Sequence, residues 1–166
     1  MCALLLGPFG AFGALALPAQ AQPSSQSIAQ GRFSGPLFGD VDDLKVGDCF
    51  NTDDELKDYE GEDRKAPLSV DVVPCDESHQ SEAFAVFDLR GGPYPGDKEI
   101  DAMAEEKCAG KALTDYVGAD AKLPETMTVY YYAPREGSWS SSDRVITCFL
   151  GDTNGPSTGS VRAAGS

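Results

Sequence analysis

Four widely spaced cysteines are the residues of this 166-residue chain with the most readily defined chemistry. Cys49, Cys75, Cys108 and Cys148 lie downstream of an apolar N-terminal segment with the features of an export signal. An even set of cysteines in an exported chain predicts disulfides, which persist outside the reducing cytosol. Zinc is a poor alternative because the spacing lacks a close Cys-x2-Cys pair. The cysteines therefore indicate an oxidising compartment and argue against a cysteine nucleophile.

The predicted elements favour one pairing of these cysteines. Cys108 lies on the apolar stripe of a predicted helix, and Cys148 lies on the apolar face of a predicted strand. Packing that helix on that strand would bring the two together. Cys49 and Cys75 end two short strands that a hairpin would make neighbours. Cys49–Cys75 with Cys108–Cys148 is therefore favoured, while the other two of the three connectivities stay open.

His79, the one histidine of the chain, follows Cys75 closely enough for a Cys–His nucleophile pair. An oxidised Cys75 offers no thiolate, so disulfide formation removes that chemistry. We expect His79 to make structural hydrogen bonds, with contact to a partner as the alternative. No Ser-His-Asp order and no paired-carboxylate signature can be argued from the sequence, which therefore predicts no catalytic residue.

The acidic stretch after the first predicted strand partly matches a calcium-binding loop. Residues of ligand type stand at positions 1, 3, 5 and 12 of that template, namely Asn51, Asp53, Glu55 and Glu62. Position 6, where the sharp turn needs Gly, is Leu56, and no flanking helices are evident. The sequence therefore predicts weak cation binding by crowded carboxylates, and neither a built metal site nor a cofactor.

Tyr130, Tyr131, Tyr132 and Trp139 form an aromatic cluster that could stack on a sugar ring or anchor a protein partner. On a strand, Tyr130 and Tyr132 share one face and Tyr131 points to the other. At least one tyrosine is therefore expected at the surface. Core packing is nevertheless the favoured interpretation of the cluster.

Composition divides the chain into four parts. Residues 1–21 are uncharged, mostly apolar and end in a small-x-small pattern, which favours a cleaved signal peptide. The missing positive n-region keeps a truncated membrane anchor open as the alternative. Residues 22–43 are predicted to be a flexible linker, residues 44–150 the folded domain and residues 151–166 a disordered tail.

The formal net charge of −14 narrows the class of partner. Such a balance argues against binding to nucleic acid and against adsorption to anionic lipid headgroups. We therefore expect membrane contact only through the N-terminal segment. A solvated acidic surface that aids solubility is the favoured reading of the charge.

The folded domain is predicted to be α+β. A helix is predicted from Lys98 to about Tyr116, because apolar residues recur there at helical spacing. Asp97 is its expected N-cap and Gly118 its expected stop. Strands are predicted within residues 44–50, 68–75, 83–89, 126–133 and 144–150. One main helix packed on a mostly antiparallel sheet of about five strands follows from this order.

An ordered series of short motifs resembles the septum-formation domain of actinobacteria. The motifs are Val46-Gly47-Asp48-Cys49-Phe50, Val72-Val73-Pro74-Cys75 with His79 and Glu82, Tyr94-Pro95-Gly96, Cys108, Pro134, Ser138-Trp139, Asp143-Arg144 and Cys148. They span about residues 44–150. The resemblance implies an extracytoplasmic module, usually behind one membrane-spanning helix, with a non-enzymatic role in septum assembly. It also implies that the four matched cysteines form disulfides.

The chain departs from the family pattern at two positions. Ser142 stands where the family tends to have Gly before Asp-Arg, and Ser78 stands where Pro commonly precedes the histidine. Neither departure touches the cysteines.

The sequence is compatible with three functions. The leading hypothesis is an extracytoplasmic interaction module, secreted or anchored on the outer face of the plasma membrane, that docks an envelope or division protein. The alternatives are a domain that binds cell-wall glycan and a carboxylate-based hydrolase. The candidate partner contacts are His79, Tyr131, Trp139 and Arg144.

Overall fold

The computed structural model of the chain describes residues 37–56, 67 and 69–164. The predicted signal or anchor at residues 1–21 lies outside the described residues, as does most of the predicted linker. Within the described part of the chain, no helix is both long enough and apolar enough to cross a bilayer.

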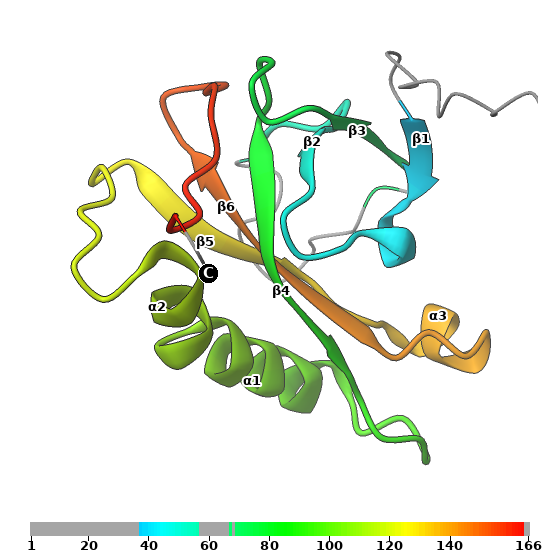
Figure 1. Cartoon of the computed structure of the whole chain (residues 1–166). Helices are drawn as coiled ribbons and strands as arrows, with labels where there is room; N and C mark the ends of the chain where they lie inside the picture. The colour runs from blue at the N-terminus through cyan, green and yellow to red at the C-terminus, as the bar shows by residue number, and fades with distance from the viewer. Residues whose placement is uncertain (1–36, 57–66, 68, 165–166) are drawn as a thin grey trace, which may run out of the picture. The chain divides into compact units, whose positions relative to one another are not determined.

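The centre of the fold is an antiparallel sheet of six strands in the order β1-β3-β2-β4-β6-β5 (Figure 1). The strands are β1 (Leu37–Asp40), β2 (Cys49–Asn51), β3 (Ser69–Val73), β4 (Ser81–Asp88), β5 (Met127–Tyr132) and β6 (Val145–Asp152). Every pair of neighbours runs antiparallel. The predicted α+β class is confirmed. Strand β1 lies in the segment predicted as linker, so the folded domain begins earlier than the sequence indicates.

One main helix, bent near its end, packs on the sheet as predicted. It consists of α1 (Asp97–Cys108) and α2 (Lys111–Val117), which are separated at Gly110. Gly110 has a φ of 64°, a left-handed conformation that ends the first helix and redirects the chain. Gly118 stops α2 as expected, but the N-cap of α1 is Gly96 rather than Asp97. The Asp97 carboxylate instead accepts a hydrogen bond from the Tyr94 hydroxyl.

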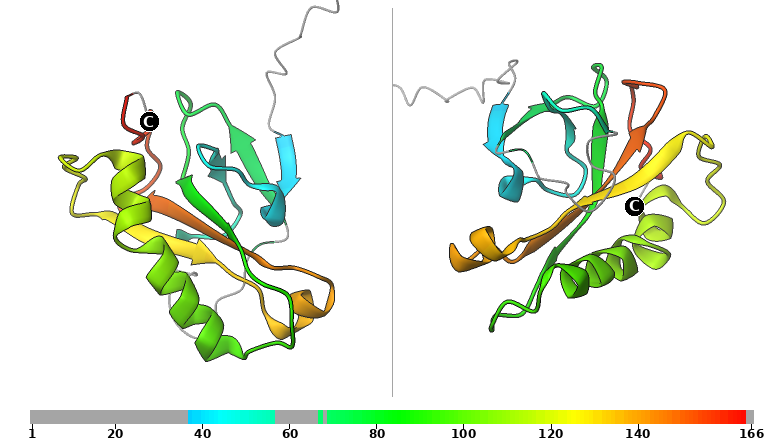
Figure 2. Two further views of the ribbon diagram at one scale, coloured as in Figure 1. Left: turned by 60° about the horizontal axis from the view of Figure 1, so that its bottom comes forward. Right: turned by 180° about the vertical axis from the view of Figure 1, so that it is seen from behind.

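Each face of the sheet has its own core. The helices cover one face, where Ile146, Cys148 and Leu150 of β6 meet the apolar side of α1 and α2. On the other face, the β2–β3 side of the sheet brings Phe50 and Val70 against side chains of β5 and β6. Figure 2 shows these two layers on opposite sides of the long strands.

The three consecutive tyrosines of β5 are buried because both faces are covered. Tyr130 and Tyr132 belong to the core under β2 and β3, and Tyr131 belongs to the core under the helices. All three are at most 8% exposed. The expectation that at least one of them reaches the surface is therefore wrong, and core packing is the correct interpretation.

Two disulfides staple the domain with the favoured connectivity. Cys49 is bonded to Cys75, with Cα atoms 5.2 Å apart, and Cys108 is bonded to Cys148, with Cα atoms 5.4 Å apart. The second bond joins the last turn of α1 to β6, where the helix stripe meets the sheet. Disulfides persist in oxidising compartments, so both bonds are consistent with an extracytoplasmic location.

Residues 153–164, predicted as part of a disordered tail, pack against the domain instead. Ser157 forms an isolated antiparallel bridge with His79, with backbone hydrogen bonds of 2.9 Å in both directions. Gly159 N–H donates to the Cys75 carbonyl at 2.6 Å, and Ala163 N–H donates to the Tyr116 carbonyl at 2.9 Å. The sequence signal was misleading because Gly- and Ser-rich composition hides backbone pairing, which needs no particular side chain.

A short helix, α3 (Glu136–Ser140), occupies the turn predicted between β5 and β6. The chain leaves α3 through Ser142, which has a φ of 76° and is the one non-glycine residue with positive φ among those described. A Cβ in this region costs roughly 1–2 kcal/mol. The left-handed backbone gives a physical reason for Gly at this position in the family that the chain resembles.

Removal of the Cys108–Cys148 bond should loosen the contact between helix and sheet. The bond closes a loop with a sequence separation of 40 residues. The closure entropy of such a loop corresponds to roughly 4 kcal/mol in the chain-entropy model. We expect the double variant Cys108→Ser/Cys148→Ser to unfold at a clearly lower urea concentration than the parent and to be cleaved faster by protease. The control is Cys2→Ser, which changes the fifth cysteine of the chain, in the predicted signal or anchor segment, and should unfold like the parent. An unchanged midpoint of urea unfolding in the double variant would contradict the role assigned to the bond.

Relief of the strain at Ser142 should stabilise the domain. We expect Ser142→Gly to raise the free energy of unfolding by about 0.5–1 kcal/mol, because Gly adopts positive φ without the Cβ penalty but loses more entropy on folding. Ser141→Gly is the matched control, since Ser141 has a φ of −92° and gains nothing from Gly. Denaturant melts of the two variants test this, and equal destabilisation by both would show that the backbone at residue 142 is unstrained.

Candidate functional site

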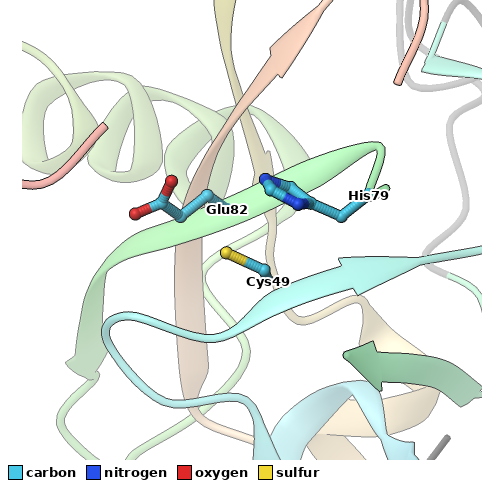
Figure 3. A group of neighbouring side chains, drawn as sticks. All are labelled: Cys49, His79 and Glu82. Atoms are coloured by element: carbon cyan, nitrogen blue, oxygen red, sulfur yellow. The ribbon is translucent and has the colours of Figure 1, made fainter. Parts of the chain in front are cut away.

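Three buried side chains with metal-ligand chemistry meet between β2 and β4 (Figure 3). Cys49 begins β2, His79 precedes β4, and Glu82 lies in β4 directly opposite Cys49 in the strand register. One sulfur, one ring nitrogen and one carboxylate oxygen lie within 4.8 Å of one another. The Cys49 sulfur is bonded to Cys75 and is therefore not the thiolate that a metal ion requires.

The Glu82 carboxylate is occupied by hydrogen bonds from the protein. Its Oε1 accepts from the Tyr116 hydroxyl at 2.6 Å and from the Ser160 hydroxyl at 2.5 Å, and its Oε2 accepts from the Val161 N–H at 2.9 Å. Burial, followed by the hydrogen bond to Glu82, raises the pKa of Tyr116 above its usual value, so this hydroxyl remains a donor. Glu82 thus joins β4, helix α2 and the C-terminal segment. A lone acidic residue beside an apolar strand run is the sequence signal that could have identified it.

His79 makes structural contacts, as expected. Its ring is 2% exposed, and Nδ1 lies 2.9 Å from the Glu77 carbonyl. Since a carbonyl only accepts, this contact assigns the proton to Nδ1. The backbone of the same residue pairs with Ser157. His79 therefore helps to hold the C-terminal segment and does not present its ring on the surface to a partner.

Trp139 is packed against the side chains of Arg144 and Tyr94. The Arg144 guanidinium lies 3.7 Å above its ring, and the Tyr94 ring lies 5.6 Å away. Its Nε1 donates to the Gly92 carbonyl at 3.0 Å. Trp139 is 7% exposed, so it joins α3 to the loop before α1 and is not a free anchor for a partner.

The two other candidate contacts are also tied into the fold. Tyr131 is 8% exposed, and its hydroxyl lies 3.3 Å from Oδ1 of Asp101. Arg144 is half-buried and donates from Nη1 to the Trp139 carbonyl at 2.8 Å. The structure thus places Tyr131 under the helices and brings Trp139 and Arg144 together. Arg144 keeps the most accessible surface of the four candidate partner contacts.

The described part of the calcium-loop template does not assemble a site. The Asn51 side chain donates to the Ser78 carbonyl at 3.2 Å and accepts from the Gln80 N–H at 2.9 Å. Leu56 packs against Gly151, where a Cβ would lie 2.7 Å from a Leu56 methyl group. Glu62 lies outside the described residues. Asn51 therefore orients the loop before β4 and has no free oxygen aimed at an ion.

A hollow of about 360 Å³ lies on the face of the sheet opposite helices α1 and α2. No pattern in the sequence indicates it. We call it the acidic hollow because Asp40, Asp42 and Asp143 line it, together with Thr147 and Arg135 among others. Asp40 and Asp42 come from the start of the domain, at β1 and the 3-10 turn Val41–Asp43, whereas Asp143 comes from the approach to β6. The sheet therefore brings together carboxylates that lie about 100 residues apart in the chain.

The carboxylates of the acidic hollow repel one another. Partial burial, then the negative charges of Asp143, Asp40 and Asp43, raise the pKa of Asp42 above its usual value of 3.8. Arg135 offsets little of this charge because its guanidinium is engaged by Asp101 at 3.0 Å and Asp97 at 3.9 Å on α1. Among the described residues, the hollow thus combines an excess of negative charge with room for a ligand.

Asp42→Asn should stabilise the domain at neutral pH but not at acid pH. A raised pKa means that the folded state binds the proton more tightly than the unfolded state, so the contribution of Asp42 to stability falls as pH rises through the range just above 3.8. We expect the variant to melt at a higher temperature than the parent at pH 7, and the difference to vanish near pH 3. Asp76→Asn, on an exposed loop outside the hollow, is the control. An equal shift in both variants would attribute the effect to net charge and not to the hollow.

Comparison with known proteins agrees with the sequence motifs. A family model described as septum formation matches residues 41–148, which span both disulfides and all three helices. No curated protein and no solved structure matches the chain. Because the family model covers more than half of the sequence, the chain belongs to the septum-formation family.

Proposed function

We propose that this chain is a non-enzymatic, extracytoplasmic interaction domain that docks an envelope or division protein during septum assembly. It is secreted or held at the outer face of the plasma membrane, works without a cofactor and does not bind nucleic acid. The family match supports the link to the septum, and the two disulfides support the compartment.

The observation that carries the proposal is that the side chains with reactive chemistry hold the fold together. Cys49 is oxidised, His79 is buried with its Nδ1 bonded to a carbonyl, and Glu82 accepts three hydrogen bonds. A general base or nucleophile must reach a substrate, whereas these groups are enclosed and occupied by the protein itself. The arrangement favours binding over catalysis.

The glycan-binding and hydrolase alternatives receive less support. Stacking on sugar needs an accessible aromatic face, and Trp139 carries Arg144 on its ring. A hydrolase needs one carboxyl group held protonated in an enclosed site, and Asp42 is exposed at the acidic hollow. A protein partner remains the best-supported ligand.

Localisation in dividing cells tests this function. We expect a fluorescent fusion of the full chain, in the cell that encodes it, to concentrate at the division site while septa form. A fusion that carries residues 1–36 alone is the control and should spread evenly over the envelope, because it ends before β1, the first strand of the domain. An even distribution of the full chain at every stage of division, or equal concentration of the control at septa, would contradict docking by the domain.

A further inference from the structure

The described surface offers a partner little apolar area. Val46 is the one large hydrophobic side chain that is exposed among the described residues. A docking surface on this part of the chain must therefore act through charged and polar contacts. The acidic hollow is one place where such groups surround an open space.

Charge repulsion in the acidic hollow favours a cationic ligand. Asp40, Asp42 and Asp143 line the same 360 Å³. Partial burial, and after it repulsion from the neighbouring carboxylates, raises the pKa of Asp42. Arg135, which also lines the hollow, is paired with acidic residues of α1. A cation in this space would relieve repulsion among these three carboxylates that the described basic residue of the lining, Arg135, offsets little.

A polar side chain of the sheet also lines the hollow. Thr147 of β6 is 2% exposed and lines it. Within the described residues its hydroxyl makes no hydrogen bond, and it is not one of the fully enclosed side-chain atoms that lack a partner. The hydroxyl is therefore accessible to a group that enters the hollow.

The spacing of the acidic groups selects the kind of cation. Among the described residues, Cys49, His79 and Glu82 are the one group of three whose ligand atoms lie close enough together to share a metal ion. The carboxylates of the hollow therefore do not converge on a single point, as a small divalent cation requires. A guanidinium or ammonium group carries several donors on a long side chain and can bridge acceptors that stand apart.

We infer that the acidic hollow is the docking site for an arginine- or lysine-bearing segment of the protein partner, with Asp42 and Asp143 pairing with the cation and Thr147 accepting a hydrogen bond. This inference rests on the proposed function and names the chemistry of its partner. Residues that line the hollow come from β1 and the turn that follows it, from β5, α3 and β6, and Figure 1 labels these strands and α3. Residues 40–42 at the start of the domain and Asp143 just before β6 both line the hollow, so a docked segment would contact two distant parts of the chain.

Binding of a short peptide by the purified full chain tests the site. The probe is a fluorescein-labelled peptide with two arginines between glycines, and the matched peptide carries citrulline, which has the same shape without the charge. We expect Asp42→Asn/Asp143→Asn to weaken binding of the arginine peptide roughly tenfold, and the citrulline peptide not to bind. Asn at residue 143 can still accept the Val145 N–H, which Asp143 accepts at 2.9 Å, so the local turn is kept.

Two further variants distinguish binding at the acidic hollow from nonspecific attraction of the peptide to the negatively charged protein. Asp76→Asn/Glu77→Gln removes the same charge from an exposed loop and should leave the affinity within about twofold of the parent. Thr147→Val changes no charge and should still weaken binding. Three results would overturn the assignment. The first is equal weakening of peptide binding by the two double variants, and the second is unchanged binding by Thr147→Val. The third is displacement of the peptide by Ca²⁺ or Mg²⁺ alone.

The same variants in cells distinguish this inference from the function on which it rests. If Asp42→Asn/Asp143→Asn concentrates at septa like the parent, the domain docks through another surface and the assignment of the hollow is wrong. If the variant spreads over the envelope while Asp76→Asn/Glu77→Gln stays at septa, the hollow is the docking site. If the parent itself is spread evenly, the proposed function fails, whatever the peptide binding shows.

Discussion

The burial of β6 on both faces is the constraint that organises this domain. Ile146, Cys148 and Leu150 point toward the helices, while Thr147 and Phe149 point toward the layer that contains β2 and β3. A strand that is apolar on both sides must be covered twice, because each exposed face would leave apolar area in water. The helix pair and the β1–β3 layer are the two covers. The Cys108–Cys148 bond fixes the first cover, and the Cys49–Cys75 bond ties β2 to the segment that leads into β4.

A buried carboxylate fixes the C-terminal segment in the same way. Glu82 lies inside the fold, where an ionised group without donors would be costly. Two of its three hydrogen bonds come from Ser160 and Val161, which lie beyond the last residue of the family match. The segment after β6 is therefore part of the folded unit. If the Ser160 and Val161 donors were lost, the hydrogen bond from the Tyr116 hydroxyl would be the one left of these three.

Local patterns in the sequence were sufficient for the main elements but not for the way they meet. Helical spacing placed Cys108 on a buried stripe, and strand alternation placed Cys148 on the facing surface, so their bond could be predicted from two short windows. The break at Gly110 was missed because one glycine inside a helical pattern is often tolerated. The exposure of the β5 tyrosines was misjudged because alternation assigns faces, whereas burial depends on what covers each face. No local pattern could bring Asp42 and Asp143 together, since their proximity exists only in the assembled sheet.

The residues that carry the family resemblance are largely those that hold the fold. The four cysteines are bonded, Trp139 and Arg144 stack, and His79 and Glu82 fasten the C-terminal segment. A motif made of such residues identifies this scaffold, because in this chain they hold the helices, the strands and the C-terminal segment together. The proposed contact with a partner would then use side chains that the scaffold positions but that take no part in holding the fold together. In the acidic hollow, Asp42 and Thr147 meet that condition. Asp42 bears a charge that neighbouring carboxylates oppose, and Thr147 brings a hydroxyl to the lining. Substitutions in this lining are therefore expected to alter the proposed docking while the disulfides and the contact between Trp139 and Arg144 keep the fold.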